Sequence, residues 1–353
     1  MAFGKEDVLS VSGEYGVINQ IAFQGRSFAG ESVADYHVVE TDDIVYTKSP
    51  LKANPYGIIK VNKGIPGIVS TLYAVYHPLN TVAPRFVDLY FANDLRLNKF
   101  LKPLVNIGAK HDMKVNNSFV LTGTVVFPSI GEQQKLVDFF AKLDRRIEAQ
   151  RKIVDTLKKY KRGLIKALLS GTVTFSGGDC ESWETVSLAD IFTISAGGDI
   201  DRQNSSPTYS PSYPYPVYAN ALTNKGLYGY ANYFKVKGDS ITVSGRGEVG
   251  HAIARHCKYV PIVRLLSLVP KYDDDVDFFA YMINATSIYI ESTGVPQLTS
   301  PQLGAIKVLR PPISEQKRLS SLLLKIDAKI ENAERLTLYL DKIRASMLQQ
   351  LFI

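Results

Sequence analysis

The chain has 353 residues, of which 45% are hydrophobic and 21% charged, and its formal net charge is +7. This composition is that of a globular protein, and the length predicts two or three structural units rather than one. No apolar run approaches the roughly 20 residues of a membrane span, which excludes an integral membrane protein, and the basic balance admits an acidic partner such as nucleic acid.

The cysteines and the N-terminus bear on the cellular compartment. Cys180 and Cys257 are the only two cysteines and lie far apart, so we expect neither a disulfide framework nor a zinc site. The five histidines show no paired metal-ligand spacing either, and the opening segment MAFGKEDVLS lacks the apolar stretch of a signal peptide. We therefore expect a cytoplasmic, soluble protein without a bound metal.

Residues 1–127 are predicted to form a mainly β domain. The segment is rich in Tyr, Val, Gly and Pro, with short alternating stretches separated by turns. Its NPYG at Asn54 imitates the N-P-P-Y motif of amino-methyltransferases but lacks the second proline. No P-loop or cofactor-binding glycine motif accompanies it, so we expect no catalysis by this chain.

Residues 128–171 are predicted to form one long helix. Apolar residues recur at spacings of three and four, Gly131 is placed to cap the start, and Gly171 is placed to end the helix. Some forty helical residues would make a rod of about 60 Å. Residues 131–170 also hold eleven Lys or Arg against five Asp or Glu, a basic excess that by itself is typical of a solvated helix face and that admits an acidic partner.

Residues 172–310 are predicted to form a second mainly β domain, and they contain the stretch TVSGRGEVGHAIAR. Gly245, Gly247 and Gly250 match the G-x-G-x-x-G of dinucleotide-binding turns. That site needs a helix after the glycines, whereas the residues that follow alternate like strands and include Pro261. We therefore interpret the stretch as a tight loop between strands and disfavour a nucleotide-dependent enzyme.

Residues 311–353 are predicted to form a second long helix that repeats the first. PSIGEQQKLVDFFAKLDRRIEAQRKIVDTL at Pro128 and PPISEQKRLSSLLLKIDAKIENAERLTLYL at Pro311 align without a gap at an offset of 183, with ten of thirty positions identical. Ser314 is the predicted cap of this second copy. The two rods are predicted to pair as an antiparallel coiled coil. The predicted seam residues are Leu136, Phe140, Leu143, Ile147, Val154, Leu157, Leu164, Leu319, Leu323, Ile326, Ile330, Leu340 and Met347.

The two β domains also correspond, more loosely. SGEYGVIN at Ser12 resembles KGLYGYAN at Lys225, and Gly57 in NPYGIIK falls opposite Gly250 in EVGHAIAR. We therefore predict an α+β fold in which two β domains alternate with two long helices in a pseudo-twofold repeat. The first domain lacks a counterpart of roughly residues 182–211, which leaves open whether it is functional.

These motifs resemble one known family. FPSIGEQQKLVDFFAKLDRRIEAQ, LKKYKRGLIKALLSG, WETVSLADIFTISAGG and PPISEQKRLSSLLLKIDAKI, in this order, are similar to the specificity subunit of type I restriction–modification systems. The resemblance implies two target recognition domains, each reading one half of a split DNA site, with the helices setting the gap. It also implies docking of two methyltransferase subunits, and it leaves open whether restriction subunits join them. Any S-adenosylmethionine, ATP and magnesium would belong to those partners, because this chain is expected to be non-catalytic.

Base reading needs Arg, Lys, Asn or Gln at base edges and donors for phosphates, which turns can supply. The candidate DNA-binding residues are Lys48, Ser49, Lys52, Arg202, Tyr218, Asn220, Asn224, Lys225, Ser244, Arg246, Gln297, Thr299 and Ser300. The competing hypothesis is a coiled-coil adaptor whose β domains bind proteins. The target bases and the gap length are not predictable from the residues.

Overall fold

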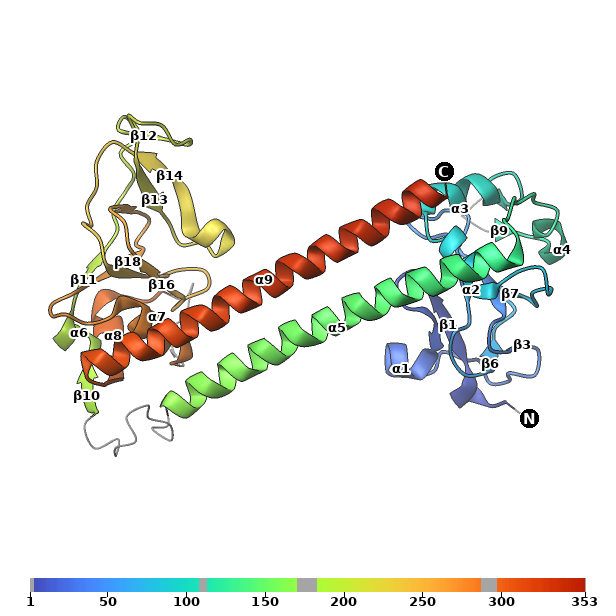
Figure 1. The fold of residues 1–353 in the computed structure, drawn as a ribbon, viewed down its shortest axis with the longest axis horizontal. Coiled ribbons are helices and arrows are strands. Elements are labelled where there is room, and N and C mark those ends of the chain that lie inside the picture. The colour runs from blue at the N-terminus through green and yellow to red at the C-terminus, as the bar shows by residue number, and fades with distance from the viewer. Residues whose placement is uncertain (1–2, 108–112, 170–182, 287–296, 353) are drawn as a thin grey trace. The chain divides into compact units, whose positions relative to one another are not determined.

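The computed structural model describes residues 3–107, 113–169, 183–286 and 297–352. The chain forms two compact units: unit 1 comprises Met1–Arg151 with Arg335–Ile353, and unit 2 comprises Lys152–Glu334. Two long helices, α5 (Ile130–Leu169) and α9 (Ile313–Leu351), contribute residues to both units (Figure 1). Gly171 and Cys180 lie outside the described residues.

Helices α5 and α9 are paired within each unit by side chains of opposite charge. The ion pairs are Asp144–Arg344 and Arg151–Asp341 in unit 1, and Lys158–Glu334 and Lys161–Asp327 in unit 2. Because the residue numbers rise along α5 while those of the partners fall along α9, the helices are antiparallel (Figure 1). The predicted α+β class with two antiparallel long helices is confirmed.

The thirteen predicted seam residues are all buried or half-buried. Toward the helix ends they also join the cores of the β domains. Leu319 and Leu323 belong to the main core of unit 2, whereas Phe140 packs with Phe86 in unit 1. The apolar stripe of each helix therefore serves both the partner helix and a β domain.

Both long helices begin one residue before the predicted caps, so the assignment of Gly131 and Ser314 as caps was wrong. In α5 the capping position is Ser129, whose carbonyl accepts the amide of Gln133 at 2.9 Å and whose hydroxyl donates to Glu132 at 2.7 Å. In α9 the carbonyl of Pro312 accepts the amide of Gln316 at 3.0 Å. A proline without an N–H is tolerated there because the first helical amides have no intrahelical partner in any case.

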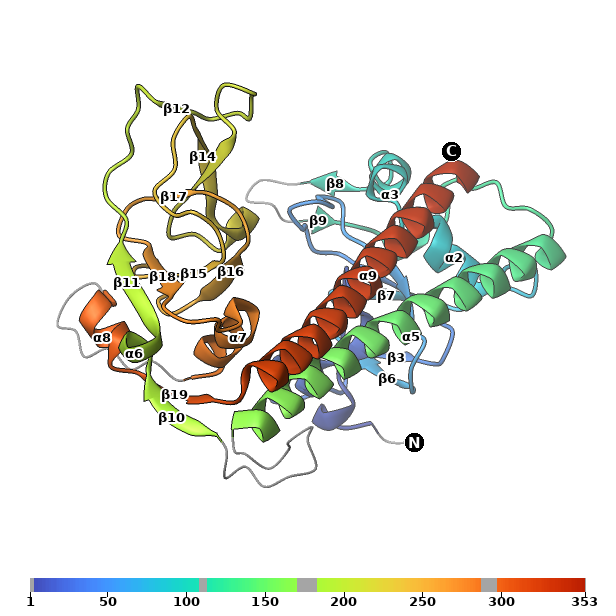
Figure 2. The ribbon, with the colours of Figure 1, turned by 60° about the vertical axis from the view of Figure 1, so that its left-hand side comes forward.

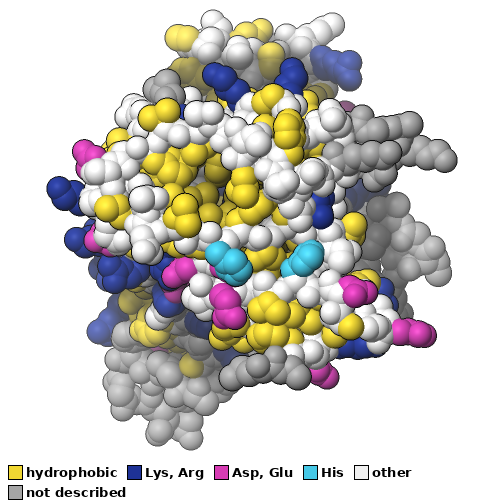
Figure 3. All heavy atoms as spheres, turned by 90° about the vertical axis from the view of Figure 1, so that its right-hand side faces the viewer, with side chains coloured by type: hydrophobic (Ala, Val, Ile, Leu, Met, Phe, Trp, Pro, Cys, Tyr) yellow, Lys and Arg dark blue, Asp and Glu magenta, His cyan; other side chains and the backbone are white. Residues whose placement is uncertain are grey.

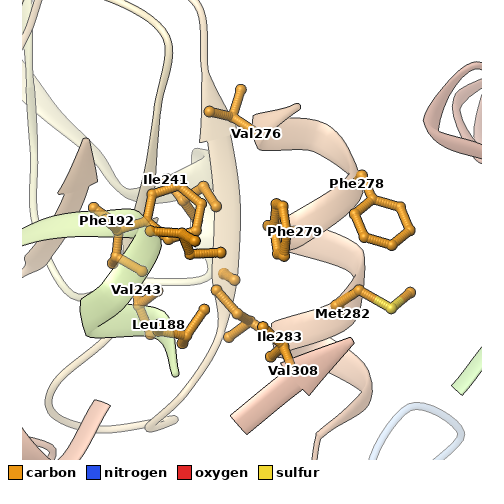
Figure 4. Packing of buried hydrophobic residues seen from close by; sticks show 14 of the residues in the cluster. Leu188, Phe192, Ile241, Val243, Val276, Phe278, Phe279, Met282, Ile283 and Val308 are labelled. Atoms are coloured by element: carbon orange, nitrogen blue, oxygen red, sulfur yellow. The ribbon is translucent and has the colours of Figure 1, made fainter. Parts of the chain in front are cut away.

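Unit 2 is built around a four-stranded sheet with the order β11–β18–β15–β16. Its strands are β11 (Phe192–Ala196), β18 (Leu266–Pro270), β15 (Ser240–Val243) and β16 (Ala252–Arg255), all antiparallel. Helix α7 (Val276–Ala285) covers this sheet, and Figure 4 shows Phe279 and Ile283 pointing from α7 toward Ile241 and Val243. This cluster is the largest hydrophobic core of unit 2.

A second sheet of unit 2 has the order β12–β14–β13–β17. Its strands are β12 (Ser205–Ser206), β14 (Leu227–Ala231), β13 (Tyr215–Tyr218) and β17 (Val260–Pro261). Figure 2 shows this sheet at the end of unit 2 opposite to α7. The remaining elements are β10 (Glu184–Ser187), which pairs with β19 (Lys307–Arg310), the short helices α6 (Leu188–Ile191) and α8 (Ser300–Gly304), and the turn η4 (Thr223–Gly226).

Unit 1 contains several small sheets, the largest with the order β5–β4–β7. The strands are β1 (Leu9–Ser12), β2 (Gly16–Asn19), β3 (His37–Val39), β4 (Ile44–Thr47), β5 (Ile59–Val61), β6 (Gly67–Val69), β7 (Tyr73–Tyr76), β8 (Asn106–Ile107) and β9 (Met113–Lys114). The helices ahead of α5 are η1 (Lys5–Asp7), α1 (Gln20–Gln24), α2 (Pro84–Tyr90), α3 (Asp94–Leu101) and α4 (Asn117–Val120). Residues of α2 and α3 close the core beside Tyr46 of β4.

The central strands of the two units share one arrangement. β4 lies between β5 and β7 in unit 1, as β15 lies between β16 and β18 in unit 2, and each pairing is antiparallel. In both units the loop after the central strand ends at a glycine with φ +87°, Gly57 or Gly250. The hydroxyl of Thr47 or Ser244 accepts the amide after that glycine, at 3.1 and 3.0 Å. The predicted match of Gly57 to Gly250 therefore has a local geometric basis, while the pseudo-twofold relation stays a prediction.

The glutamine of the repeated P-x-I-x-E-Q motif ties each long helix to the β domain before it. In unit 1 the buried Gln133 accepts the amide of Ala83, the N-cap of α2, at 2.9 Å. Its amide group donates to the carbonyls of Pro128 and Thr81, at 2.9 and 3.2 Å. A buried amide side chain satisfied on both ends holds its helix in one position.

Gln316 repeats this arrangement in unit 2. It accepts the amide of Asp275, the N-cap of α7, at 2.9 Å and donates to the carbonyl of Pro311 at 2.9 Å. It also donates to Asp274 at 3.0 Å, a carboxylate that Arg310 engages as well. The two copies of the motif thus perform the same structural task.

Candidate nucleic-acid interface

The glycine-rich stretch of unit 2 is a loop between antiparallel strands. Residues 244–251 connect β15 directly to β16. Ser244 is buried, donates its hydroxyl to the Glu248 carbonyl, and accepts the amide of His251. Because no helix opens on the glycines, the turn cannot present a helix N-terminus to a pyrophosphate, and the interpretation as a tight loop is confirmed.

Three loops of unit 2 are bonded to one another, and we call residues 219–226, 244–250 and 297–299 the loop surface. Asn220 accepts the amide of Gly245 at 2.8 Å, and the amide of Leu298 donates to the Gly245 carbonyl at 2.9 Å. The guanidinium of Arg246 donates to Gln297 Oε1 at 3.0 and 3.2 Å, although the two residues are 51 positions apart. Arg246 is exposed, so its remaining N–H groups face solvent.

The buried Arg255 supports the loop surface through three contacts. Its side chain lies with Cζ 3.6 Å from the centre of the Tyr218 ring, donates to Thr242 at 2.9 Å, and donates to the carbonyl of Lys225 at 2.7 Å. Lys225 and its neighbour Asn224 are exposed and have positive φ values of 51° and 49°. Arg255 therefore holds a turn in a rarely populated conformation, with the side chains of Asn224 and Lys225 outward.

A cleft of about 970 Å³ adjoins the turn of Lys225 in unit 2. One side of the cleft is formed by α7 and β16. The other side is formed by the residues that α5 and α9 contribute to unit 2. Its cationic lining comprises Lys161, Arg162, Lys166 and Lys225. Lys161 is paired with Asp327, whereas Arg162 and Lys166 are exposed. Part of the basic excess predicted for residues 131–170 thus faces this cleft.

The protonation states of three groups in or near the cleft are set by burial. Burial lowers the pKa of His251, and Arg255 lowers it further, whereas Glu248 raises it. The net result is a pKa below the ordinary 6.5, so the ring is neutral at pH 7. Burial also raises the pKa of Tyr281, whose hydroxyl donates to Asp327 at 2.6 Å. Burial raises the pKa of Tyr218 as well, opposed by Arg255, and its phenol stays protonated.

The side chains of the other predicted residues of unit 2 make local contacts or none. Arg202 is exposed next to a turn closed by Asp201, whose carboxylate accepts amides of residues 203 and 204. Thr299 caps α8 through a reciprocal bond with Gln302, and Ser300 is the first residue of that helix. The Ser244 hydroxyl, as described, is occupied within its own loop.

In unit 1 the loop after β4 carries the predicted residues Lys48, Ser49 and Lys52. Lys48 donates to Asn117 at 3.3 Å, and burial lowers its pKa below the ordinary 10.5. Ser49 is half-buried and Lys52 is exposed. Asn54 is buried, donates to Asp94 and accepts from the side chain of residue 98, so the NPYG stretch has a structural role.

Sequence reasoning missed the residues that join or support the loops. Arg255 gave no local signal because it occupies an ordinary strand position, and its burial depends on Tyr218 and Thr242. The pairing of Arg246 with Gln297 is likewise a contact between distant segments. The basic excess of residues 131–170 indicated that cations lie along this helix. It did not identify Lys166 as a residue of the cleft.

The part of the chain that the structure describes has neither a metal-binding cluster nor a membrane-spanning helix. Within these stretches no group of three or more His, Cys, Asp and Glu side chains could hold a metal ion. No helix among them is long and apolar enough to cross a membrane.

Comparison with known proteins gives one consistent result. Residues 180–339 match the family described as type I restriction modification DNA specificity domain. The chain is 26% identical over 238 residues to a putative type I specificity subunit of Mycoplasma pneumoniae, covering 67% of this chain and 62% of that protein. It is 24% identical over 275 residues to a putative type I restriction enzyme specificity subunit of Methanocaldococcus jannaschii, covering 71% and 63%.

Solved structures share the fold. The type I restriction–modification S subunit from M. genitalium aligns with a TM-score of 0.58 and 15% identity, covering 99% of this chain and 89% of that one. A chain from a study of the assembly of a type I restriction–modification system aligns with a TM-score of 0.56 and 16% identity, covering 91% and 84%.

The strand domains and the paired long helices therefore have the same fold as these two solved structures. Residues 180–339 match the type I restriction modification DNA specificity domain family, and the resemblance of the chain to type I specificity subunits is confirmed. The matches with the two curated relatives described above cover less than two thirds of either relative's length.

Proposed function

We propose that this chain is the DNA-recognition subunit of a type I restriction–modification complex and that the loop surface reads bases. The observation that carries the proposal is the exposed Arg246, oriented by Gln297 and placed on loops bonded to the turn of Asn224 and Lys225. Arg contacts guanine, and Asn or Gln contacts adenine, through paired hydrogen bonds in the major groove. A guanidinium already held by a neighbour loses less conformational freedom on binding.

The cleft beside this surface supplies the phosphate contacts in the proposal through its basic side chains, which share the lining with Asp277, Asp327 and Glu331. Arg162, Lys166 and Lys225 neutralise backbone charge, which gives affinity without sequence preference. The corresponding loop of unit 1, with Lys48, Ser49 and Lys52, reads the second half of a bipartite target. The chain itself carries no catalysis, and it docks two methyltransferase subunits, to which S-adenosylmethionine, ATP and magnesium belong.

The test is the methylation pattern of a genome in which the chain is expressed with its methyltransferase subunit. A split, asymmetric methylated motif is expected. Arg246→Ala should relax one base position of one half-site, at a cost of about 1–3 kcal/mol in binding. Lys237→Ala removes an exposed cation outside the loop surface and serves as the control.

Three outcomes decide between the hypotheses. A relaxed position in Arg246→Ala but not in Lys237→Ala supports base reading by the loop surface. Loss of the second half-site alone in a Lys48→Ala, Lys52→Ala variant supports reading by unit 1. Methylation or binding without sequence preference contradicts the proposal and favours the protein-binding adaptor.

A further inference from the structure

Two turns of unit 2 contain residues with a positive backbone φ. Five non-glycine residues in the described part of the chain have a positive φ, and four of them form two consecutive pairs. One pair is Asn224 and Lys225, described above. The other is Val263 and Arg264, with φ values of 51° and 60°, in the turn between β17 and β18. A valine in this region is an outlier, because its Cβ lies too close to the backbone.

The position of this turn in the fold does not require a positive φ. The corresponding turn of unit 1 precedes β7, which pairs with β4 as β18 pairs with β15. In unit 2 the amide of Leu265 donates to the carbonyl of Ile262 at 3.0 Å. In unit 1 the amide of Tyr73 donates to the carbonyl of Ser70, also at 3.0 Å, yet the two residues between them have no positive φ. The strained conformation is therefore particular to the turn of unit 2.

Hydrogen bonds from three neighbouring segments hold the strained turn. The amides of its two residues donate to the main-chain carbonyls at positions 197 and 198, both at 2.9 Å. The side chain of Asn220 donates to the carbonyl of Val263 at 2.5 Å and accepts the amide of Gly245 at 2.8 Å. Strained backbone persists only where the surrounding structure over-determines it, and such positions cluster at functional sites.

The strained turn adjoins the loop surface. A side-chain carbon at Gly245 would lie 2.9 Å from the carbonyl oxygen of Arg264, so a glycine is needed for the two segments to approach this closely. Gly245 is followed directly by Arg246. Val263 is 48% exposed, and Arg264 is exposed as well. The turn therefore presents one apolar and one cationic side chain next to the loop that carries Arg246.

Exposure alone does not identify Val263 as a binding residue. Apolar side chains are common on protein surfaces, and Figure 3 shows many of them around a hollow on the face that unit 1 presents in that view. Val263 differs because its exposure coincides with an unfavourable backbone conformation and with a position beside Arg246.

We infer that Val263 contacts the 5-methyl group of a thymine in the half-site read by unit 2, and that Arg264 contacts a neighbouring phosphate. The inference rests on the proposed function, since it places the turn against the same duplex that Arg246 reads. In the major groove thymine alone presents an apolar group, and a valine side chain has no donor or acceptor with which to read another base. The half-site therefore contains an A·T pair next to the base pair that Arg246 contacts.

The experiment measures binding of the full chain, with its methyltransferase subunit, to duplexes that carry the methylated motif. Each thymine of the half-site is replaced in turn by deoxyuridine, which lacks only the methyl group. We expect one replacement to weaken binding by about fourfold, the contribution of one buried methyl group. In Val263→Gly this replacement should have no effect, and glycine keeps the turn because it adopts a positive φ readily. Val269→Ala removes another exposed valine of unit 2 and should keep the loss.

Arg264→Asn tests the phosphate contact. Asparagine tolerates this backbone region, so the variant removes the charge and keeps the turn. Its affinity should fall for every duplex, and the slope of log K against log salt should decrease by about one unit. An unchanged slope would overturn the contact assigned to Arg264.

Failure of the inference is distinguishable from failure of the proposed function. The inference alone is overturned if Arg246→Ala relaxes one position but the half-site lacks an A·T pair, no deoxyuridine weakens binding, or the loss persists in Val263→Gly. Binding without sequence preference, or an unchanged motif in Arg246→Ala, would contradict the proposed function and the inference together. A cooperative urea transition, followed by the fluorescence of Trp183, shows that unit 2 of Val263→Gly is folded.

Discussion

Gln133 and Gln316 are single side chains that each join a long helix to a β domain. Both are buried with 1% exposure, and each satisfies main-chain groups that have no other partner at a helix start. A buried donor or acceptor left without a partner costs about 1–3 kcal/mol. Removing such a side chain should therefore have an effect far larger than its few atoms suggest.

We predict that Gln316→Ala lowers the free energy of unfolding of unit 2 by about 2–3 kcal/mol, because the Asp275 amide and the Pro311 carbonyl lose their partner. The measurement is urea unfolding followed by the fluorescence of Trp183, which lies in unit 2. Gln133→Ala removes the equivalent tie in unit 1 and should shift this transition less. Identical midpoints for Gln316→Ala and wild type would contradict the prediction.

His256 makes the stability of unit 2 depend on pH. Burial lowers its pKa, but the hydrogen bond with Asp239 at 2.8 Å and the proximity of Asp277 at 3.0 Å outweigh that effect, and the pKa is raised above 6.5. A raised pKa stabilises the folded state fully below 6.5, and the stabilisation is lost as the pH rises through the folded-state pKa.

We therefore predict that the wild type has a higher free energy of unfolding than His256→Asn. The difference between the two proteins should be larger at pH 6 than at pH 8.5. The difference should stay below about 1 kcal/mol, because the imidazole is 55% exposed and its ion pairs are screened by solvent. Urea titrations at the two pH values provide the measurement. A stability difference that is the same at both values would show that the ion pairs contribute nothing.

At the scale of elements, the ion pairs that join α5 and α9 differ in the groups that surround them. Asp341 meets Arg151 at an exposed position. Asp327 meets Lys161 at 2.6 Å and also accepts from the half-buried Tyr281 at 2.6 Å. Exposed pairs contribute about 0–1 kcal/mol, whereas a carboxylate that satisfies a second, less exposed group contributes more.

We predict that Asp327→Ala destabilises the protein by about 2 kcal/mol and Asp341→Ala by less than about 1 kcal/mol. Thermal unfolding followed by far-UV circular dichroism compares the two variants directly. Tyr281→Phe combined with Asp327→Ala should cost less than the two single changes together, because both remove the same hydrogen bond. Equal losses for the two aspartate variants would argue against the role given to Tyr281.

The long helices were predictable because their signal is local and occurs twice. Apolar residues at three- and four-residue spacing identified α5 and α9, and the repeat supplied each with a partner of the same length. The caps were misplaced by two residues. In α5 a signal was present but not used, because Ser129 and Glu132 form the S-x-x-E pattern of a capping box, in which the Ser129 amide donates to Glu132 at 3.0 Å. Pro312 carries no such signal, since it caps α9 through its carbonyl alone. The loop between β15 and β16 was predictable from the strand-like residues after Gly250.

The candidate site was predictable only as a set of loops. Arg246 and Gln297 were selected separately as residue types suited to base edges, and nothing in the sequence joined them. Arg255 was not selected, because a buried arginine on a strand has no signature that distinguishes it from an exposed one. Such contacts between distant segments depend on how β13, β15 and β16 come together, which local patterns do not specify.

At the scale of the molecule, the proposed function depends on the net charge of +7 and on where the cations lie. We predict that DNA affinity falls steeply with salt and that Lys166→Ala reduces the slope of log K against log salt by about one unit for all sequences. Titrations of specific and unrelated duplexes over a range of salt concentrations provide the measurement. Lys237→Ala should leave the slope unchanged, and an unchanged slope in Lys166→Ala would remove the cleft from the DNA path.

The glutamine ties have a consequence for how such a chain can evolve. In unit 1 the bonds of Gln133 go to the main chain at positions 81, 83 and 128, and main-chain groups are present whatever side chains occupy those positions. A β domain can therefore accumulate substitutions, or be replaced by recombination with a divergent gene, without losing its attachment to the helix. The fixed element in unit 1 is the glutamine, whereas the side chains at the three positions that it binds are free to change.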